Sequence, residues 1–232
     1  MNLLLSTPAL NVFEHMALDE EMVFARPAET TFRFYRWTEG PAATFGYAQI
    51  YKEVEQAAPQ GQFPGGKTRR PTGGGLVFHR DDLTFSLIFC SRQKPLEIYK
   101  TFHGMVFNEL LKIGQKGQVF TESLPACSYM PSVGNCASAC FVRPVENDLL
   151  AEDGQKILGG AIRRFGETVL YQGSLQLPAA RENALYKHAL ISAVRNFMAT
   201  DLIPQRVEAS WLAASRKRAK ELYQTVAWLE KF

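Results

Sequence analysis

Three consecutive glycines in this chain lead directly into an apolar strand that ends on a histidine. The segment from Arg69 to His79 reads Arg-Arg-Pro-Thr-Gly-Gly-Gly-Leu-Val-Phe-His. Because glycine has no side chain, the N–H groups of such a loop can approach an anionic or carbonyl oxygen closely. Flexible linkers are typically Ser/Gly repeats between polar residues, whereas this run has a basic entry and an apolar exit. The pattern predicts a binding loop held by a strand.

The length and composition fit one domain better than two. The chain has 232 residues, of which 46% are hydrophobic, and this is enough to bury one large core. Segment 56–66 is rich in Gln, Pro and Gly, and the sequence on both sides is strand-like, so it is interpreted as a surface loop rather than a domain boundary. We expect residues 1–232 to form a single domain without a C-terminal accessory domain.

The charge argues against a nucleic-acid partner, and the hydropathy argues against a membrane partner. A formal charge of +3 is too small to indicate nucleic-acid binding, and the basic run 215–220 lies in an amphipathic pattern typical of a solvated helix face. The N-terminus lacks the basic region of a signal peptide, and no run of about 18 apolar residues is present to span a bilayer. These features predict a cytoplasmic protein.

The cysteines are expected to be reduced thiols rather than disulfides or metal ligands. In the cytoplasm Cys90, Cys127, Cys136 and Cys140 would stay reduced. The last three form no C-x-x-C pair and have no histidine close by in sequence, so no metal site is predicted. Segment 128–139 is rich in Ser, Gly, Asn and Pro, which is typical of an irregular loop where a thiol can be reached.

Hydrophobic periodicity predicts an α+β fold. Adjacent hairpins favour mixed, mostly antiparallel sheets with packed helices over a doubly wound parallel sheet. An Asp-Gly pair at 153–154 is a strong signal for a tight turn. The predicted helices cover residues 13–24, 98–113, 181–199 and 210–231. The predicted strands cover 31–37 and 169–177, together with two hairpins, 76–79 with 83–89 and 147–151 with 156–164.

The three consecutive glycines do not fit the motifs of several familiar enzyme classes. Gly73, Gly74 and Gly75 match neither the G-x-G-x-x-G fingerprint of dinucleotide-binding folds nor the P-loop of nucleotide triphosphatases. The G-x-S-x-G elbow of serine hydrolases is also absent from the sequence. The loop therefore belongs to a different kind of site.

Four segments of the chain, in this order, match motifs of a known enzyme superfamily. Residues 11–20 look like its opening helix, and 32–37 with 45–49 look like its "RFYxW…GYxQ" strands. The glycine segment is similar to its "RRxTGGGxVxH" loop, which is the most specific of the four. Residues 147–149 (Asn-Asp-Leu) and 156–161 (Lys-Ile-Leu-Gly-Gly-Ala) resemble its "NDL…KIxGxA" hairpin. Over most of residues 11–177, the chain resembles the superfamily of lipoate-protein ligase A, octanoyltransferases and biotin-protein ligases.

The resemblance implies a biotin/lipoate ligase catalytic-domain-like fold that transfers an octanoyl or lipoyl group to one lysine of a lipoyl domain or of the glycine-cleavage H protein. In that family the glycine loop lines an acyl tunnel, and the lysine that matches Lys156 contacts the acyl carbonyl. A fixed ammonium and converging amides would stabilise the oxyanion formed when a carbonyl is attacked. The matching acyl- or substrate-binding positions are Arg70, Thr72, Gly73, Gly74, Gly75, His79, Asn147, Asp148, Gly159 and Ala161.

Three of these residues have simpler interpretations when the resemblance is set aside. Lys156 closely follows a turn, where an exposed lysine is common. His79 fits a capping residue at the mouth of a hairpin, and Arg70 fits a surface ion pair. A positive charge beside glycine amides also suits an anionic substrate.

Two reactions fit the resemblance, and the favoured one uses a cysteine. Ala139-Cys140-Phe141 resembles the "ACF" segment of octanoyltransferases, which take the chain from acyl carrier protein through a cysteine thioester without a cofactor. A nearby Lys156 cation would lower the pKa of the Cys140 thiol and favour the thiolate. A ligase would instead use ATP and Mg to form an acyl-adenylate. The third hypothesis is a non-catalytic acyl-binding relative.

Overall fold

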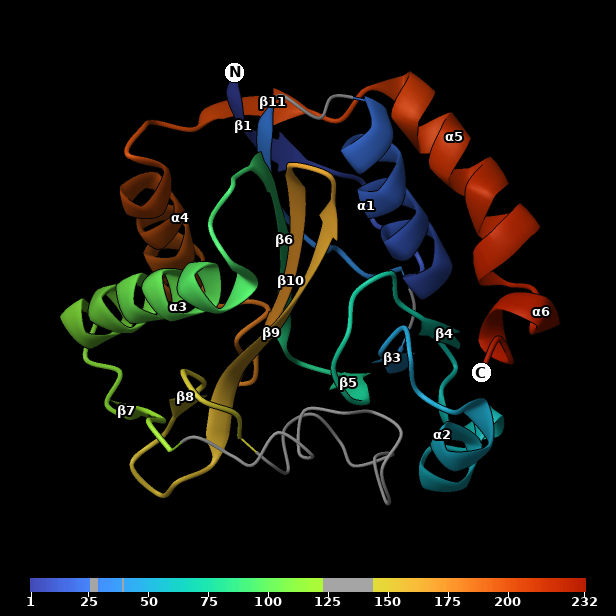
Figure 1. The fold of residues 1–232 in the computed structure, drawn as a ribbon, viewed down its shortest axis with the longest axis horizontal. Coiled ribbons are helices and arrows are strands. Elements are labelled where there is room, and N and C mark those ends of the chain that lie inside the picture. Colours follow the sequence, from blue (N-terminus) through green and yellow to red (C-terminus); the bar gives the residue numbers. More distant parts are fainter. Residues whose placement is uncertain (26–28, 39, 123–143) are drawn as a thin grey trace.

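The computed structural model describes residues 1–25, 29–38, 40–122 and 144–232, which build two β-sheets and the helices packed against them (Figure 1). The larger sheet consists of β1 (Asn2–Ser6), β2 (Thr30–Phe34), β6 (Leu83–Cys90), β7 (Gln118–Val119), β8 (Leu149–Leu150), β9 (Lys156–Phe165), β10 (Thr168–Leu175) and β11 (Ile203–Arg206). The smaller sheet consists of β3 (Ala42–Phe45), β4 (Lys67–Arg69) and β5 (Val77–His79).

The larger sheet is mixed and mostly antiparallel, as predicted. Its strand order is β11-β1-β2-β6-β10-β9-β8-β7, and that of the smaller sheet is β4-β3-β5. β1 runs parallel to both β11 and β2, whereas the pairs from β2 to β7 are antiparallel. The predicted α+β class is therefore confirmed.

Helices cover both faces of the larger sheet (Figure 1). These are α1 (Val12–Ala25) and α5 (Ala209–Arg218) on one face, and α3 (Pro95–Lys112) and α4 (Ala184–Met198) on the other. Two short helices, α2 (Tyr51–Ala57) and α6 (Val226–Leu229), lie beside the smaller sheet. In β6, Phe85, Leu87 and Phe89 pack in the cluster formed with α3 and α4, and Ile88 packs in the cluster formed with α1 and α5. Side chains alternate between the faces of a strand, so burial on both faces explains why β6 is a continuous apolar run.

The predicted hairpin of residues 76–79 with 83–89 is wrong. β5 pairs with β3 in the smaller sheet, whereas β6 pairs with β2 and β10 in the larger one. Residues 80–82 therefore connect the two sheets. The carboxylate of Asp82 in this connection accepts hydrogen bonds from Thr84 and Ser174. Sequence alternation identifies a strand but not its partner.

The last helix also differs from the prediction, because 210–231 divides into α5, a π-helical segment (Ala219–Tyr223) and α6. The Thr225 hydroxyl accepts from the Trp228 N–H and so caps a new helix start. Segment 56–66 contains the end of α2 and a 3₁₀ turn instead of a plain loop. The hairpin at the Asp-Gly pair is confirmed, with a φ of +82° at Gly154 between β8 and β9.

A buried ion pair joins α1 to the centre of the larger sheet. Asp19 and Arg33 are fully buried, and Arg33 donates to Asp19 Oδ1 from Nε (2.9 Å) and Nη2 (2.6 Å). Ser86 also donates to Oδ1 (2.7 Å), while Gln172 (2.8 Å) and the Tyr35 hydroxyl donate to Oδ2. A buried charge is tolerated when it is paired and hydrogen-bonded. This carboxylate therefore fixes α1 against β2, β6 and β10.

The glycine segment follows β4 and packs against the chain that leaves β3. A Cβ built on Gly46 would lie 1.9 Å from the carbonyl oxygen of Gly74, so the two backbones can touch only at a glycine. Gly74 itself has a φ of +85°, which glycine adopts without the strain of a side chain. The Tyr47 N–H donates to the Thr72 carbonyl (2.8 Å) and fixes the start of the loop.

Asp19→Ala should destabilise the fold strongly, because it leaves the Arg33 guanidinium buried without its counter-charge. We expect the free energy of unfolding, measured by urea titration, to fall by roughly 3–5 kcal/mol. The control Glu167→Ala removes only an exposed ion pair with Arg92 and should change that energy by less than about 1 kcal/mol. Similar losses in the two variants would contradict the role of Asp19.

Gly46→Ala should displace the glycine loop, because its methyl group and the Gly74 carbonyl cannot occupy the same space. We expect the melting temperature to fall by roughly 5–10 °C in a thermal scan. Gly61→Ala is the matched control, since nothing lies within 4 Å of a Cβ at that position. An unchanged melting temperature in Gly46→Ala would show that the loop does not depend on this contact.

Candidate active site

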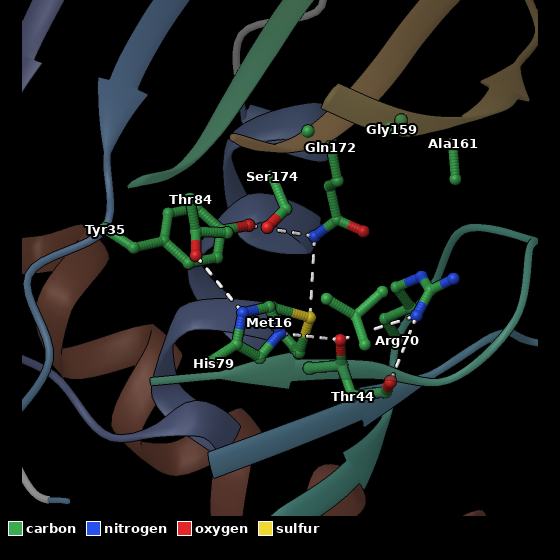
Figure 2. A pocket seen from close by; sticks show the side chains of 13 residues that line it. Met16, Tyr35, Thr44, Arg70, His79, Thr84, Gly159, Ala161, Gln172 and Ser174 are labelled. Carbon is green, nitrogen blue, oxygen red and sulfur yellow. Dashed lines mark hydrogen bonds between the residues drawn. The ribbon is translucent and has the colours of Figure 1, made fainter. Parts of the chain in front are cut away.

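A pocket lies between the two sheets, beside α1 (Figure 2). From the larger sheet and the chain beside it, the lining residues are Tyr35, Thr84, Gly159, Gly160, Ala161, Gln172, Gly173 and Ser174. The opposite wall comes from Thr44, Arg70, Val77 and His79, and α1 contributes Met16. Most of the surface that faces the interior is apolar.

The pairing of β9 with β10 forms one wall from small residues. Gly160 pairs with Gly173 across the two strands. A Cβ on Gly160 would lie 2.2 Å from the Tyr171 hydroxyl, and one on Gly173 would lie 2.5 Å from the ring of Phe85. The glycines thus let aromatic rings close the face toward α3. Gly159 and Ala161 alternate onto the opposite face, where they leave room for a ligand.

His79 is a buried part of the pocket wall and not a cap at a hairpin mouth. Its Nδ1 donates to the carboxylate of Asp82 (2.9 Å), and its Nε2 lies 2.9 Å from the Thr44 hydroxyl. Burial disfavours the charged form of Asp82, but the His79 ring and the hydrogen bonds from Ser174 and Thr84 outweigh it and hold the pKa of Asp82 below its usual value. This network fixes the position of the imidazole ring.

Arg70 is also buried, whereas its sequence position allowed a place at the surface. Its guanidinium donates to the Gly73 carbonyl from Nε (3.0 Å) and Nη2 (2.5 Å), and to the Thr44 carbonyl (3.2 Å). Arg70 therefore connects the glycine loop to β3 while it lines the pocket (Figure 2).

Gln172 joins the pocket to the ion pair beneath it. Its side-chain nitrogen donates to Asp19, and its oxygen accepts from the Thr72 hydroxyl (2.6 Å). Thr72 and Gln172 are 100 positions apart in the sequence. The loop is thereby fixed to β10, and sequence motifs gave no sign of this role for Gln172.

Lys156 forms a buried ion pair with Asp148 at the start of β9. Its Nζ lies 2.8 Å from Asp148 Oδ2, and the lysine side chain is 2% exposed. Asp148 also accepts from the Tyr99 hydroxyl (2.5 Å) and the Val145 N–H (2.6 Å). Burial raises the pKa of Asp148 above its ordinary value, although Lys156 and Tyr99 oppose this shift. Lys156 is thus a held cation, not a solvated lysine.

An aromatic network that the sequence motifs did not reveal supports this pair. The Tyr99 hydroxyl accepts from the Gly160 N–H (3.0 Å), so it links Asp148 to the strand that lines the pocket. His103 Nδ1 donates to the Asn147 carbonyl (2.8 Å), and its Nε2 accepts from the Tyr171 hydroxyl (2.7 Å). Burial lowers the pKa of His103 to about 3, so its ring is neutral. The only sequence signal was the apolar periodicity around Tyr99 and His103.

Asn147 has a donor with no partner in the described part of the chain. Its side-chain nitrogen is buried and makes no hydrogen bond there. The residue has a φ of +71°, a conformation that asparagine tolerates better than most residues. Buried donors are nearly always satisfied, so an orphan N–H beside the Asp148–Lys156 pair suggests a ligand oxygen.

The predicted site residues fall into groups. The pocket is lined by Arg70, His79, Gly159 and Ala161. The loop beside it contains Thr72, Gly73, Gly74 and Gly75, which do not line the pocket. Asn147, Asp148 and Lys156 form a neighbouring group that Tyr99 connects to Gly160. Cys140 lies outside the described residues.

The described residues show neither a metal cluster nor a membrane span. In the ranges that the structure covers, no group of three or more His, Cys, Asp or Glu side chains gathers to hold a metal ion. None of the helices in these ranges combines the length and apolar composition needed to cross a bilayer.

Curated relatives of this chain are octanoyltransferases. Octanoyltransferase LipM of Symbiobacterium thermophilum is 28% identical over 225 residues, which cover 94% of this chain and 77% of the relative. Octanoyltransferase LipM of Moorella thermoacetica is 30% identical over 184 residues, covering 75% of this chain and 64% of the relative. The chain thus spans less than two thirds of the length of some relatives.

Solved structures with the same fold are lipoate-protein ligases. A lipoate-protein ligase A bound with ATP has a TM-score of 0.74 and 21% identity, and covers 99% of this chain and 98% of its own. The bi-partite lipoate protein ligase of Thermoplasma acidophilum, described with its E2 lipoyl domain, has a TM-score of 0.71 and 19% identity, and covers 100% and 96%. The expected ligase-like fold is confirmed.

The comparisons also confirm the resemblance drawn from the four sequence motifs. The lipoyl protein ligase A/B catalytic domain model matches residues 11–197, a range that includes both the pocket and the Asp148–Lys156 pair. The chain belongs to the lipoyl protein ligase A/B catalytic domain family.

Proposed function

We propose that this protein transfers an octanoyl group from acyl carrier protein, through a thioester on Cys140, to a lysine of a lipoyl domain or of the glycine-cleavage H protein. The curated relatives named as octanoyltransferases support this choice within the family. The likeness to ligases lies in the fold. We place the reaction in the cytoplasm.

The proposal rests on a mainly apolar pocket whose wall is connected through Tyr99 to the Asp148–Lys156 pair, together with the unsatisfied donor of the adjacent residue Asn147. The part of the pocket along Gly159 and Ala161 suits an unbranched alkyl chain, because small side chains leave room for it and it needs no polar partner. The Asn147 amide and the Lys156 ammonium suit the carbonyl end, where negative charge develops. Asp148 holds the ammonium in place before substrate arrives.

Both half-reactions then follow from ordinary acyl chemistry. The Cys140 thiolate attacks the thioester carbonyl, and the C–S bond to the carrier breaks as the carrier thiolate leaves and takes up a proton. The acceptor amine attacks the new thioester, loses a proton, and releases the Cys140 thiolate. Each attack forms an oxyanion that Lys156 and Asn147 stabilise. This route needs no cofactor.

Two other functions make different predictions. A ligase would require ATP, Mg and a free acid, and the nucleotide seen in a solved relative with this fold makes it the second candidate. An acyl-binding protein without turnover would label neither itself nor an acceptor. Incubation with octanoyl carrier protein, followed by mass spectrometry, separates the three functions.

Cys140→Ser should abolish transfer, because the hydroxyl is far less acidic than a thiol and does not form the thioester. We expect octanoyl labelling of the acceptor to fall at least about 10³-fold, with no adduct on the enzyme. Cys90→Ser is the matched control, since Cys90 is an exposed cysteine at the end of β6, outside the proposed site. Full labelling by Cys140→Ser with ATP and free octanoate would instead establish a ligase.

Asn147→Asp should slow both half-reactions, because it keeps the side-chain shape but replaces the orphan N–H with a carboxylate oxygen. We expect kcat to fall about 10²–10³-fold with little change in KM, measured with octanoyl carrier protein. Lys156→Ala should lower kcat at least as much. A circular dichroism melt unchanged within a few degrees would show that Asn147→Asp folds, and an unchanged kcat would refute the role of Asn147.

A further inference from the structure

Two cations converge on one tyrosine beside the glycine loop. Lys231 donates a hydrogen bond to the Tyr47 hydroxyl, and its ammonium lies 4.6 Å from the centroid of the tyrosine ring. The guanidinium carbon of Arg163 lies 4.4 Å from the same centroid. We call Tyr47, Arg163 and Lys231 the Tyr47 cluster.

The Tyr47 cluster is attached to the glycine segment on two sides. Arg163 donates to the Pro71 carbonyl (2.9 Å), and the Tyr47 N–H donates to the Thr72 carbonyl. Arg163 is two positions beyond Ala161, which lines the acyl pocket, and so it alternates onto the same face of β9. The cluster therefore lies at the edge of the pocket next to the loop.

The positive charge of the cluster has no carboxylate partner within the described residues. The ion pairs found there involve other cations, such as Arg33, Lys67 and Lys156. Arg163 and Lys231 instead contact a carbonyl, a phenol and aromatic rings. The hydrogen bond from Lys231, opposed by burial but reinforced by both charges, lowers the pKa of Tyr47. An oxyanion would balance this charge.

We propose that the Tyr47 cluster binds the phosphate of the acyl donor, which is the phosphodiester at the base of the carrier's pantetheine arm. The inference rests on the proposed octanoyl transfer and names the part of the donor that this edge recognises. Charge-assisted hydrogen bonds from Arg163 and Lys231 would hold the phosphate oxygens. The neighbouring backbone of the glycine loop adds a concave polar surface.

A matched pair of small donors tests the proposal. S-octanoyl-4′-phosphopantetheine and S-octanoyl-pantetheine differ only in the phosphate. With a lipoyl domain as acceptor, the unaltered protein should prefer the phosphorylated donor about tenfold in kcat/KM. Arg163→Gln and Lys231→Gln should each reduce this preference to about twofold or less. In the control Arg164→Gln the preference should persist, because Arg164 donates to the carbonyls of Ser91 and Gln93 instead.

Failure of this inference is distinguishable from failure of the proposed function. Equal use of both donors by the unaltered protein, or a preference that survives Arg163→Gln, would overturn the phosphate site while leaving octanoyl transfer intact. Calorimetric titration with 4′-phosphopantetheine and pantetheine measures the same preference without turnover, so it remains decisive if Cys140 is never acylated. If Arg163→Gln weakened only the use of octanoyl-adenylate, the assignment to the pantetheine arm would be overturned.

Discussion

Paired burial of charge is the constraint on which this structure depends. Three buried carboxylates are hydrogen-bonded, directly or through Tyr99, to residues that line the pocket. Each has a cationic or imidazole partner: Asp19 with Arg33, Asp82 with His79, and Asp148 with Lys156. An unpaired buried charge costs several kcal/mol, so each pair specifies one relative position of the elements that carry it. The pairs fix α1, the connection between the sheets, and the start of β9.

Through further hydrogen bonds, the same ion pairs are connected to the walls of a pocket that is mainly apolar inside. Gln172 links Asp19 to Thr72 of the glycine loop by hydrogen bonds. Tyr99 links Asp148 to Gly160 in the same way. Polar side chains that satisfy one another in this way leave the alkyl walls as the surface a ligand meets. The same hydrogen bonds therefore hold the pocket walls in place and keep their polar groups from facing the ligand.

Different parts of strand β9 have different contacts. Its first residue, Lys156, is held by Asp148, and we propose that it meets the carbonyl end of the substrate. Its middle residues are small and line the pocket, and Arg163 near its end belongs to the Tyr47 cluster.

The sequence by itself determined the features that obey local rules. The Asp-Gly turn, the helices α1, α3 and α4, the small residues of β9 and the glycine loop were all predictable, because turn chemistry, periodicity and side-chain size act over a few residues. The four motifs also identified the family, and they marked Arg70, His79 and Lys156 as candidate site residues.

Tertiary structure alone decided how these parts meet. The strand partners of β5 and β6, the bonds of Arg70 to the carbonyls of Gly73 and Thr44, and the contact of Thr72 with Gln172 join segments that are far apart in the chain or fold back on it. Pairing of this kind is set by mutual burial and by the need to satisfy each buried polar group. No local pattern records it, because the partner that satisfies a buried group is known only once the chain has folded.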